Sequence, residues 1–275
     1  MVETKRSLVL LTCFLSGAAC IISFVSLFTH AWVNSTVDAS NVNNYLNYGL
    51  FSGTFNQRIA TNSSADVSMT CSYSKNVCAV LCADNREARK KILDQLYNGE
   101  KTNSISCTPT KATLKSFNSF LGRRLKDTSQ DKIFINAFAY LFTIIFLILS
   151  AILGLVSVGL SVWNTASNPV EVYFSIFGLY IYNGIAFCSL LISFLIWGIM
   201  FFTSLVKGPA FLYVLDGRME PESVELGWSY WINIGSLLLY ASSIGTLYLR
   251  SYLISKEPQI KIEIEDNTPA GILLF

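Results

Sequence analysis

One apolar stretch decides the fold: residues 133–163 have the sequence IFINAFAYLFTIIFLILSAILGLVSVGLSVW, without a single charged residue. A bilayer core about 30 Å thick is crossed by about 20 helical residues. Backbone groups find no water there, so the stretch must satisfy its own hydrogen bonds, as a helix does. We therefore predict a transmembrane helix over 133–163. Three further apolar stretches follow the same rule, at 7–29, 172–205 and 228–253.

The composition agrees with a membrane protein. Of the 275 residues, 52% are hydrophobic and only 14% are charged, whereas soluble domains have about 25% charged residues. The net charge of +2 gives no argument for a nucleic-acid partner. His30 is the only histidine, and no common catalytic or nucleotide-binding motif occurs. We expect membrane lipid as the surroundings, no cofactor, no metal site and no enzymatic activity.

The first apolar stretch has a second interpretation. Its positive start and the small residues at 16–20 also occur in cleaved signal peptides. Apolar regions of signal peptides usually have about 7–15 residues, and this stretch continues to Phe28. A retained helix is therefore preferred.

Charge sets the expected topology. The flanks that include the two termini carry five Lys or Arg, against two in the loop 206–227, which favours cytosolic termini in the plasma membrane. The fold class expected is an all-α membrane fold: a four-transmembrane-helix bundle with a large, partly β, disulfide-bonded first extracellular loop. The segments between helices are the cytosolic N-terminus 1–6, extracellular loop 30–132, cytosolic turn 164–171, extracellular loop 206–227 and cytosolic tail 254–275.

The first loop shows local patterns of strands and of helices. Residues 46–55 are rich in aromatic residues and broken by glycines, which indicates strands with a bend. Residues 86–97 and 114–126 are amphipathic helix candidates. Asn34 and Asn62 begin N-glycosylation tripeptides, which suits an extracellular loop.

Four cysteines lie in the first loop: Cys71, Cys78, Cys82 and Cys107. An even number in an oxidising compartment suggests two disulfides, and four cysteines allow three pairings. A zinc site is the alternative, but histidine and a common zinc spacing are missing. The other three, which we expect to be free thiols, lie in apolar stretches: Cys13, Cys20 and Cys188.

Polar and small residues inside the apolar stretches predict helix packing. Asn136, Asn183 and Asn233 are uncharged, and we expect them to form hydrogen bonds between helices rather than an ion path. The second stretch has small residues at intervals that suit close helix contact: Ser150, Gly154, Ser157, Gly159 and Ser161.

The C-terminus, GILLF at 271–275, ends in a pattern that a PDZ groove accepts as an added strand. Phe275 would fill the terminal pocket and Leu273 the pocket two residues before it. A cytosolic PDZ-domain scaffold is therefore an expected partner.

Several short motifs carry a resemblance to a known family. Trp32 ends the first apolar stretch, and the run Tyr48, Gly49, Leu50 and Phe51 follows it. This resembles the clarin family, within the broad claudin and peripheral-myelin-protein class of tetraspan membrane proteins. Further similar motifs are AsnPro at 168–169, GlyLeuTyr at 178–180, SerTyrTrp at 229–231 and the hydrophobic C-terminus. The segment 61–131 departs from the family, because clarins usually have a shorter first loop.

The resemblance implies a non-enzymatic plasma-membrane organiser of sensory-cell membranes, linked to actin through a PDZ scaffold. Lateral membrane proteins or a second copy are possible partners. A claudin-like adhesion or paracellular strand protein is one alternative, weakened because Cys71 lies twenty residues beyond Phe51. An auxiliary subunit of an ion channel is another. A transporter or enzyme is disfavoured, because the apolar stretches contain no row of charged residues that would carry ions or protons.

Overall fold

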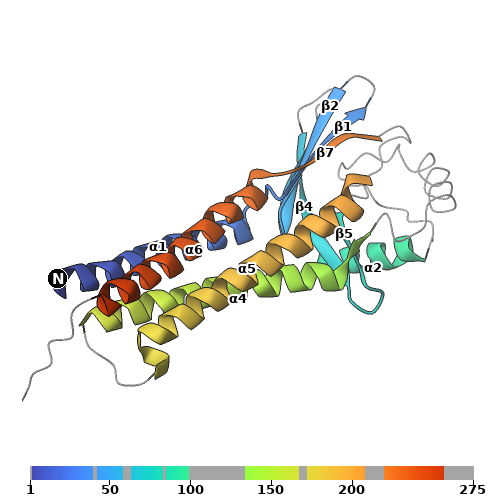
Figure 1. Cartoon of the computed structure of the whole chain (residues 1–275). Helices are drawn as coiled ribbons and strands as arrows, with labels where there is room; N and C mark the ends of the chain where they lie inside the picture. The colour runs from blue at the N-terminus through green and yellow to red at the C-terminus, as the bar shows by residue number, and fades with distance from the viewer. Residues whose placement is uncertain are drawn as a thin grey trace, which may run out of the picture.

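The computed structural model describes residues 2–39, 42–57, 63–82, 85–98, 134–166, 172–207 and 220–256. Four long helices lie side by side, and a sheet stands at one end of them (Figure 1). The helices are α1 (Val2–Phe28), α4 (Ala137–Ala166), α5 (Ile176–Thr203) and α6 (Trp228–Ser255). Each is long and apolar enough to cross a membrane.

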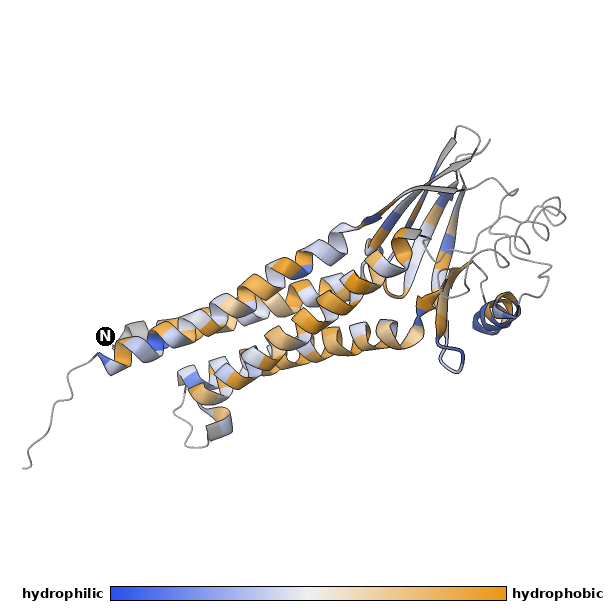
Figure 2. Ribbon diagram, turned by 45° about the vertical axis from the view of Figure 1, so that its right-hand side comes forward, coloured by the Kyte–Doolittle hydropathy of each residue, from blue (hydrophilic) through white to orange (hydrophobic). Residues whose placement is uncertain are grey.

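Most of the residues buried inside the bundle are small or polar, whereas many large apolar residues lie on its outside. Helix α1 packs against α4 and α6, and α4 also packs against α5. Lipid tails are as apolar as leucine, so helices in a bilayer associate through close packing of small residues and through hydrogen bonds. Orange along the helices in Figure 2 marks their hydrophobic residues. Many of the large apolar side chains are exposed on the outside of the bundle, among them Phe14 and Leu238.

The small residues predicted on α4 form a buried stripe with one exception. Ser150, Gly154, Ser157 and Ser161 are buried, and their spacing of four, three and four keeps them on one face of a helix. Gly159 lies on another face and is exposed, with nothing within 4 Å of a Cβ built there. Its predicted role in packing within the bundle is wrong.

Exposed aromatic residues lie at both ends of the bundle, as expected at the two membrane interfaces. Those near the sheet are Phe28, Phe51, Phe138, Trp228 and Trp231. Those at the opposite end are Trp163, Tyr173, Phe174, Tyr248 and Tyr252.

In the part of the chain that the structure describes, the sheet has seven antiparallel strands and draws on both loops. They are β1 (Val33–Ala39), β2 (Val42–Tyr48), β3 (Ser52–Gln57), β4 (Ser63–Ser72), β5 (Val77–Leu81), β6 (Ile135–Asn136) and β7 (Glu220–Leu226). Their order is β6-β5-β4-β3-β2-β1-β7. The all-α class is therefore too narrow, because most of the described part outside the spans is β structure. Strand β7, which comes from the second loop, was not predicted from the sequence.

One face of the sheet packs on the end of the bundle. Alternate strand residues, among them Val33, Leu46 and Phe55, are fully buried in one cluster with Trp197 and Leu205. Side chains along a strand point alternately to its two faces. The other residues of these strands therefore point to the opposite face of the sheet.

Helix α2 (Arg86–Tyr97) covers the opposite side of β5, as Figure 1 shows. Ile92, Leu93 and Leu96 are buried in a cluster that includes the odd-numbered residues of β5, whereas its even-numbered residues belong to the bundle cluster. The side chain of Asn85 accepts a hydrogen bond from the backbone of Glu87 and begins the helix. The helix predicted at 86–97 is confirmed, and the candidate at 114–126 lies outside the described residues.

The predicted third span, 172–205, has a regular helix only in its middle. The 3₁₀ turns η3 (Val172–Phe174) and η4 (Leu205–Lys207) flank α5. Ser175 caps α5, with its side chain accepting a hydrogen bond from Phe177 N–H.

Candidate functional site

The family motif forms the junction between the sheet and the helix bundle, which we call the outer junction. It consists of Trp32, the turn 48–51 between β2 and β3, and the start of α6 at Gly227. The turn closes with a hydrogen bond of 2.8 Å from Gly49 N–H to the carbonyl of Ser52. A Cβ at Gly49 would lie 2.0 Å from the backbone oxygen of Thr29, so the turn backbone packs directly on the end of α1.

Trp32 connects three helices at this junction. Its indole is 1% exposed and donates a hydrogen bond of 2.7 Å to the carbonyl of Ser26 in α1. The ring packs edge-on against Trp197 of α5 and Tyr230 of α6, with centroids 5.1 and 6.1 Å away. Its backbone N–H donates to the carbonyl of Tyr48, which attaches the turn to the same point.

Leu50 and Phe51 have different roles. Leu50 is fully buried, and its carbonyl accepts a hydrogen bond of 2.5 Å from the hydroxyl of Tyr140 in α4. Phe51 is 41% exposed and its ring stacks on Phe28, 6.0 Å away. Phe51 is therefore the motif residue that the junction presents to its surroundings.

The second loop enters the same junction through Gly227. Its N–H donates to the carbonyl of Trp32, and the N–H of Ser229 donates to the carbonyl of Ala31. A Cβ at Gly227 would lie 2.0 Å from that Ala31 oxygen. No short-range pattern predicts this contact, because residues 31 and 227 meet only in the folded protein.

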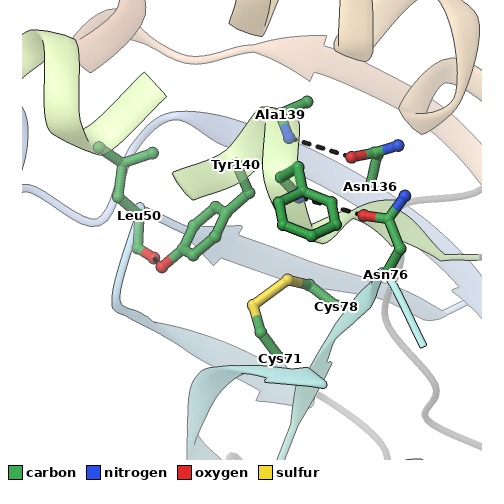
Figure 3. The surroundings of a disulfide bond; sticks show 8 residues. Leu50, Cys71, Asn76, Cys78, Asn136, Ala139 and Tyr140 are labelled. Carbon is green, nitrogen blue, oxygen red and sulfur yellow. Dashed lines mark hydrogen bonds between the residues drawn. A yellow bond between two sulfur atoms is a disulfide. The ribbon is translucent and has the colours of Figure 1, made fainter. Parts of the chain in front are cut away.

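The β4–β5 hairpin attaches the start of α4 to the sheet (Figure 3). Cys71 and Cys78 are directly opposite each other in the two strands and form a disulfide. Asn76 has a φ of 53° in the turn, a conformation that asparagine tolerates. Its backbone and side-chain oxygens accept the N–H groups of Ala137 and Phe138. These N–H groups would otherwise have no partner at a helix start.

Asn136 lies outside the span, contrary to the prediction of an interhelical role. It is exposed at the end of β6, and its side chain accepts a hydrogen bond from Ala139 N–H, 3.0 Å away. Asparagine is a favoured residue at this capping position. The chain is still in the sheet at 135–136, so the helix begins after Asn136 rather than before it.

Asn183 and Asn233 do form hydrogen bonds between helices, as predicted. The side-chain oxygen of Asn183 accepts from Ser16 of α1 and Ser243 of α6, and its nitrogen donates to Ser157 of α4. Asn183 therefore joins all four helices from α5. Asn233 of α6 donates to Ser26 of α1, next to the outer junction.

The predicted cysteine roles can be compared with the structure in part. Cys82 is also disulfide-bonded, and Cys107 lies outside the described residues. Cys13, Cys20 and Cys188 are free, as predicted.

Of the other predicted site residues, the structure describes only Asn34. Asn34 lies half-buried in β1 between β2 and β7, with Asn47 and Glu225 opposite it. Asn62, Leu273 and Phe275 lie outside the described residues.

The described residues contain no group of three or more His, Cys, Asp or Glu that could hold a metal ion. His30 lies at the rim of the outer junction, with Nδ1 2.9 Å from the carbonyl oxygen of Ser52. Burial raises the pKa of the Tyr48 phenol above its ordinary value. The outer junction is thus a packed connection between elements, and Phe51 and Phe28 are its exposed large apolar residues.

Comparison with known proteins supports the resemblance to the clarins. The chain is 27% identical to Clarin-3 of Homo sapiens over 190 residues, which are 67% of this chain. The match spans 60% of that relative's own length. No family profile matches the chain.

Proposed function

We propose that this chain is a clarin-type tetraspan of the plasma membrane, which positions membrane partners and turns over no substrate. The observation that carries the proposal is the outer junction. There the motif residues connect α1, α4, α5 and α6 to a sheet made from both loops. A sheet held in this way is a fixed platform above the membrane. The similarity to Clarin-3 agrees with this role.

We place the sheet outside the cell and both termini in the cytosol. The chain enters α1 and leaves α6 at the end of the bundle opposite the sheet (Figure 1). The larger number of Lys and Arg flanking that end favours the cytosol. The Cys71–Cys78 disulfide on the sheet side suits an oxidising compartment.

The tail would supply the cytosolic connection. Helix α6 ends at Ser255, and twenty further residues follow it in the sequence. A PDZ domain would accept Phe275 in its terminal pocket and Leu273 two residues earlier. Through such a scaffold the protein would link a membrane patch to actin, including in sensory cells.

Localisation in polarised epithelial cells tests this function. The full chain is compared with a chain lacking residues 271–275 and with Phe275→Asp, which keeps the length. Enrichment in actin-rich protrusions that both changes abolish would support the proposal. Continuous strands at cell–cell contacts that neither change affects would refute it in favour of the claudin-like alternative.

The edges of the sheet argue against the claudin-like alternative, which needs sheets that associate side by side. Among the strands that the structure describes, one edge is β6, which has two residues, and the other is β7. Strand β7 has the sequence EPESVEL, with Pro221 and three glutamates. Short edges, proline and charge are features that prevent edge-to-edge pairing.

A further inference from the structure

Helix α2 carries three exposed cations, Arg86, Lys90 and Lys91, which we call the α2 patch. Within the described part of the chain, none of the three forms an ion pair. Lys75 nearby is different, because it pairs with Asp94 at 3.0 Å and lies over the ring of Tyr97. Lys75 therefore takes part in contacts within the protein, whereas the three cations of the α2 patch are exposed to solvent.

The position of the patch gives the helix little benefit. Arg86 lies in the first turn of α2, at the positive end of the helix dipole, which disfavours a cation there. Lys91 lies four residues after Glu87, a spacing that contributes only about 0.2–0.5 kcal/mol to a helix. The patch is therefore better explained by a contact outside the chain than by the stability of α2.

The patch is also poorly suited to inserting into a bilayer. A helix that lies in a membrane interface needs a free apolar face. In α2 that face is already used, because Ile92, Leu93 and Leu96 are 8%, 1% and 1% exposed against the β5 side of the sheet. What remains outside is charged, and a soluble polyanion fits it.

We propose that the α2 patch binds a sulfated glycosaminoglycan chain at the cell surface. Arg86 and Lys90 are four residues apart, which places their Cβ atoms about 5–6 Å from each other on the helix surface. An extended chain with sulfates on successive sugars can meet such cations one after another. Basic clusters of this kind are recognised heparin-binding features. The inference rests on the proposed extracellular placement of the sheet.

The test uses the purified full chain in detergent and immobilised heparin as the probe. The patch variant is Arg86→Gln, Lys90→Gln and Lys91→Gln together. A matched control, Lys5→Gln, Arg6→Gln and Lys256→Gln, removes three positive charges at the other end of the bundle. A second control, Arg86→Lys, Lys90→Arg and Lys91→Arg, keeps the charge. Circular dichroism and an intact Cys71–Cys78 bond show that each variant is folded.

The patch variant should lose at least about tenfold in heparin affinity while both controls bind as the parent does. Its plot of log affinity against log salt should be shallower by about 2, for three cations that no longer release counterions. Equal weakening by the opposite-end control would reduce the effect to net charge and overturn the proposal. Unchanged binding by the patch variant, or binding of the parent to anionic vesicles but not to heparin, would overturn it as well.

Intact cells separate this inference from the proposed function. Antibody access to a tag inserted after residue 60, without permeabilisation, reports the side of the membrane on which the sheet lies. If heparin binding depends on the patch but the tag is hidden, the orientation fails and the proposed glycan contact at the cell surface is excluded. If the tag is accessible but heparin does not bind, the glycan inference alone fails.

Discussion

Replacing Asn183 by leucine should weaken the association of all four helices, because this side chain joins them at one buried point. Its oxygen accepts hydrogen bonds of 2.7 Å from Ser16 and 3.2 Å from Ser243, and its nitrogen donates to Ser157 at 2.5 Å. A fourth hydrogen bond goes to the carbonyl of Leu179 within the same helix and does not hold helices together. The substitution therefore removes three interhelical hydrogen bonds.

The magnitude follows from that count. Interhelical side-chain hydrogen bonds in membrane proteins average about 0.6 kcal/mol. Three of them give a loss of about 2 kcal/mol in the free energy of unfolding, or about 30-fold in the folding equilibrium. The loss should not be much larger, because Ser16 and Ser243 are 3.0 Å apart and keep a hydrogen bond with each other. Leucine also fills most of the space that the amide occupied.

Reversible unfolding in mixed micelles, followed by tryptophan fluorescence as the SDS fraction rises, measures this loss. Cys188→Ala is the matched control, because Cys188 is exposed on the same helix and should change the free energy by less than about 0.5 kcal/mol. An Asn183→Leu variant as stable as the parent would refute the reasoning. So would an equal loss in the control.

Three further predictions concern the outer junction, the disulfides and the tail. Gly49→Ala should lower the free energy of unfolding by about 1–3 kcal/mol, because its Cβ would lie 2.0 Å from the backbone oxygen of Thr29. In the same titration, Gly159→Ala should be neutral or slightly stabilising. Peptide mapping without reduction should recover Cys82 bonded to Cys107, and a free Cys107 thiol would contradict this pairing. A C-terminal peptide with Phe275→Asp should no longer bind a PDZ domain that retains the parent peptide, and unchanged retention would exclude that mode of recognition.

The transmembrane helices were predictable because each is specified locally. Every span is a continuous apolar stretch long enough to cross a bilayer, so a window of the sequence contains the whole argument. The helix at 86–97 was predictable for the same reason, from the spacing of Ile92, Leu93 and Leu96. The Asn136 error also has a local cause. Hydropathy alone cannot distinguish an uncharged capping residue such as Asn136, which precedes an apolar helix, from a residue within that helix.

The outer junction could be found only through family resemblance. Strand β7 pairs with β1, so that Leu226 is opposite Val33 at nearly two hundred residues of separation. Nothing in EPESVEL alone predicts that partner. The same holds for Tyr140, whose hydroxyl reaches the carbonyl of Leu50. Such long-range contacts depend on how the helices are packed, which a sequence pattern does not reveal.

The two-loop sheet makes the bundle and the platform depend on each other. Helix α1 continues directly into β1, and β7 continues directly into α6, so the β1–β7 pairing prolongs the α1–α6 packing beyond the membrane. At the point of transition, Trp32 and Gly227 share a backbone hydrogen bond. A partner that moves the sheet must therefore strain the helices or break this bond. The sheet and the packing of the helices are therefore coupled on physical grounds, as the proposed function requires.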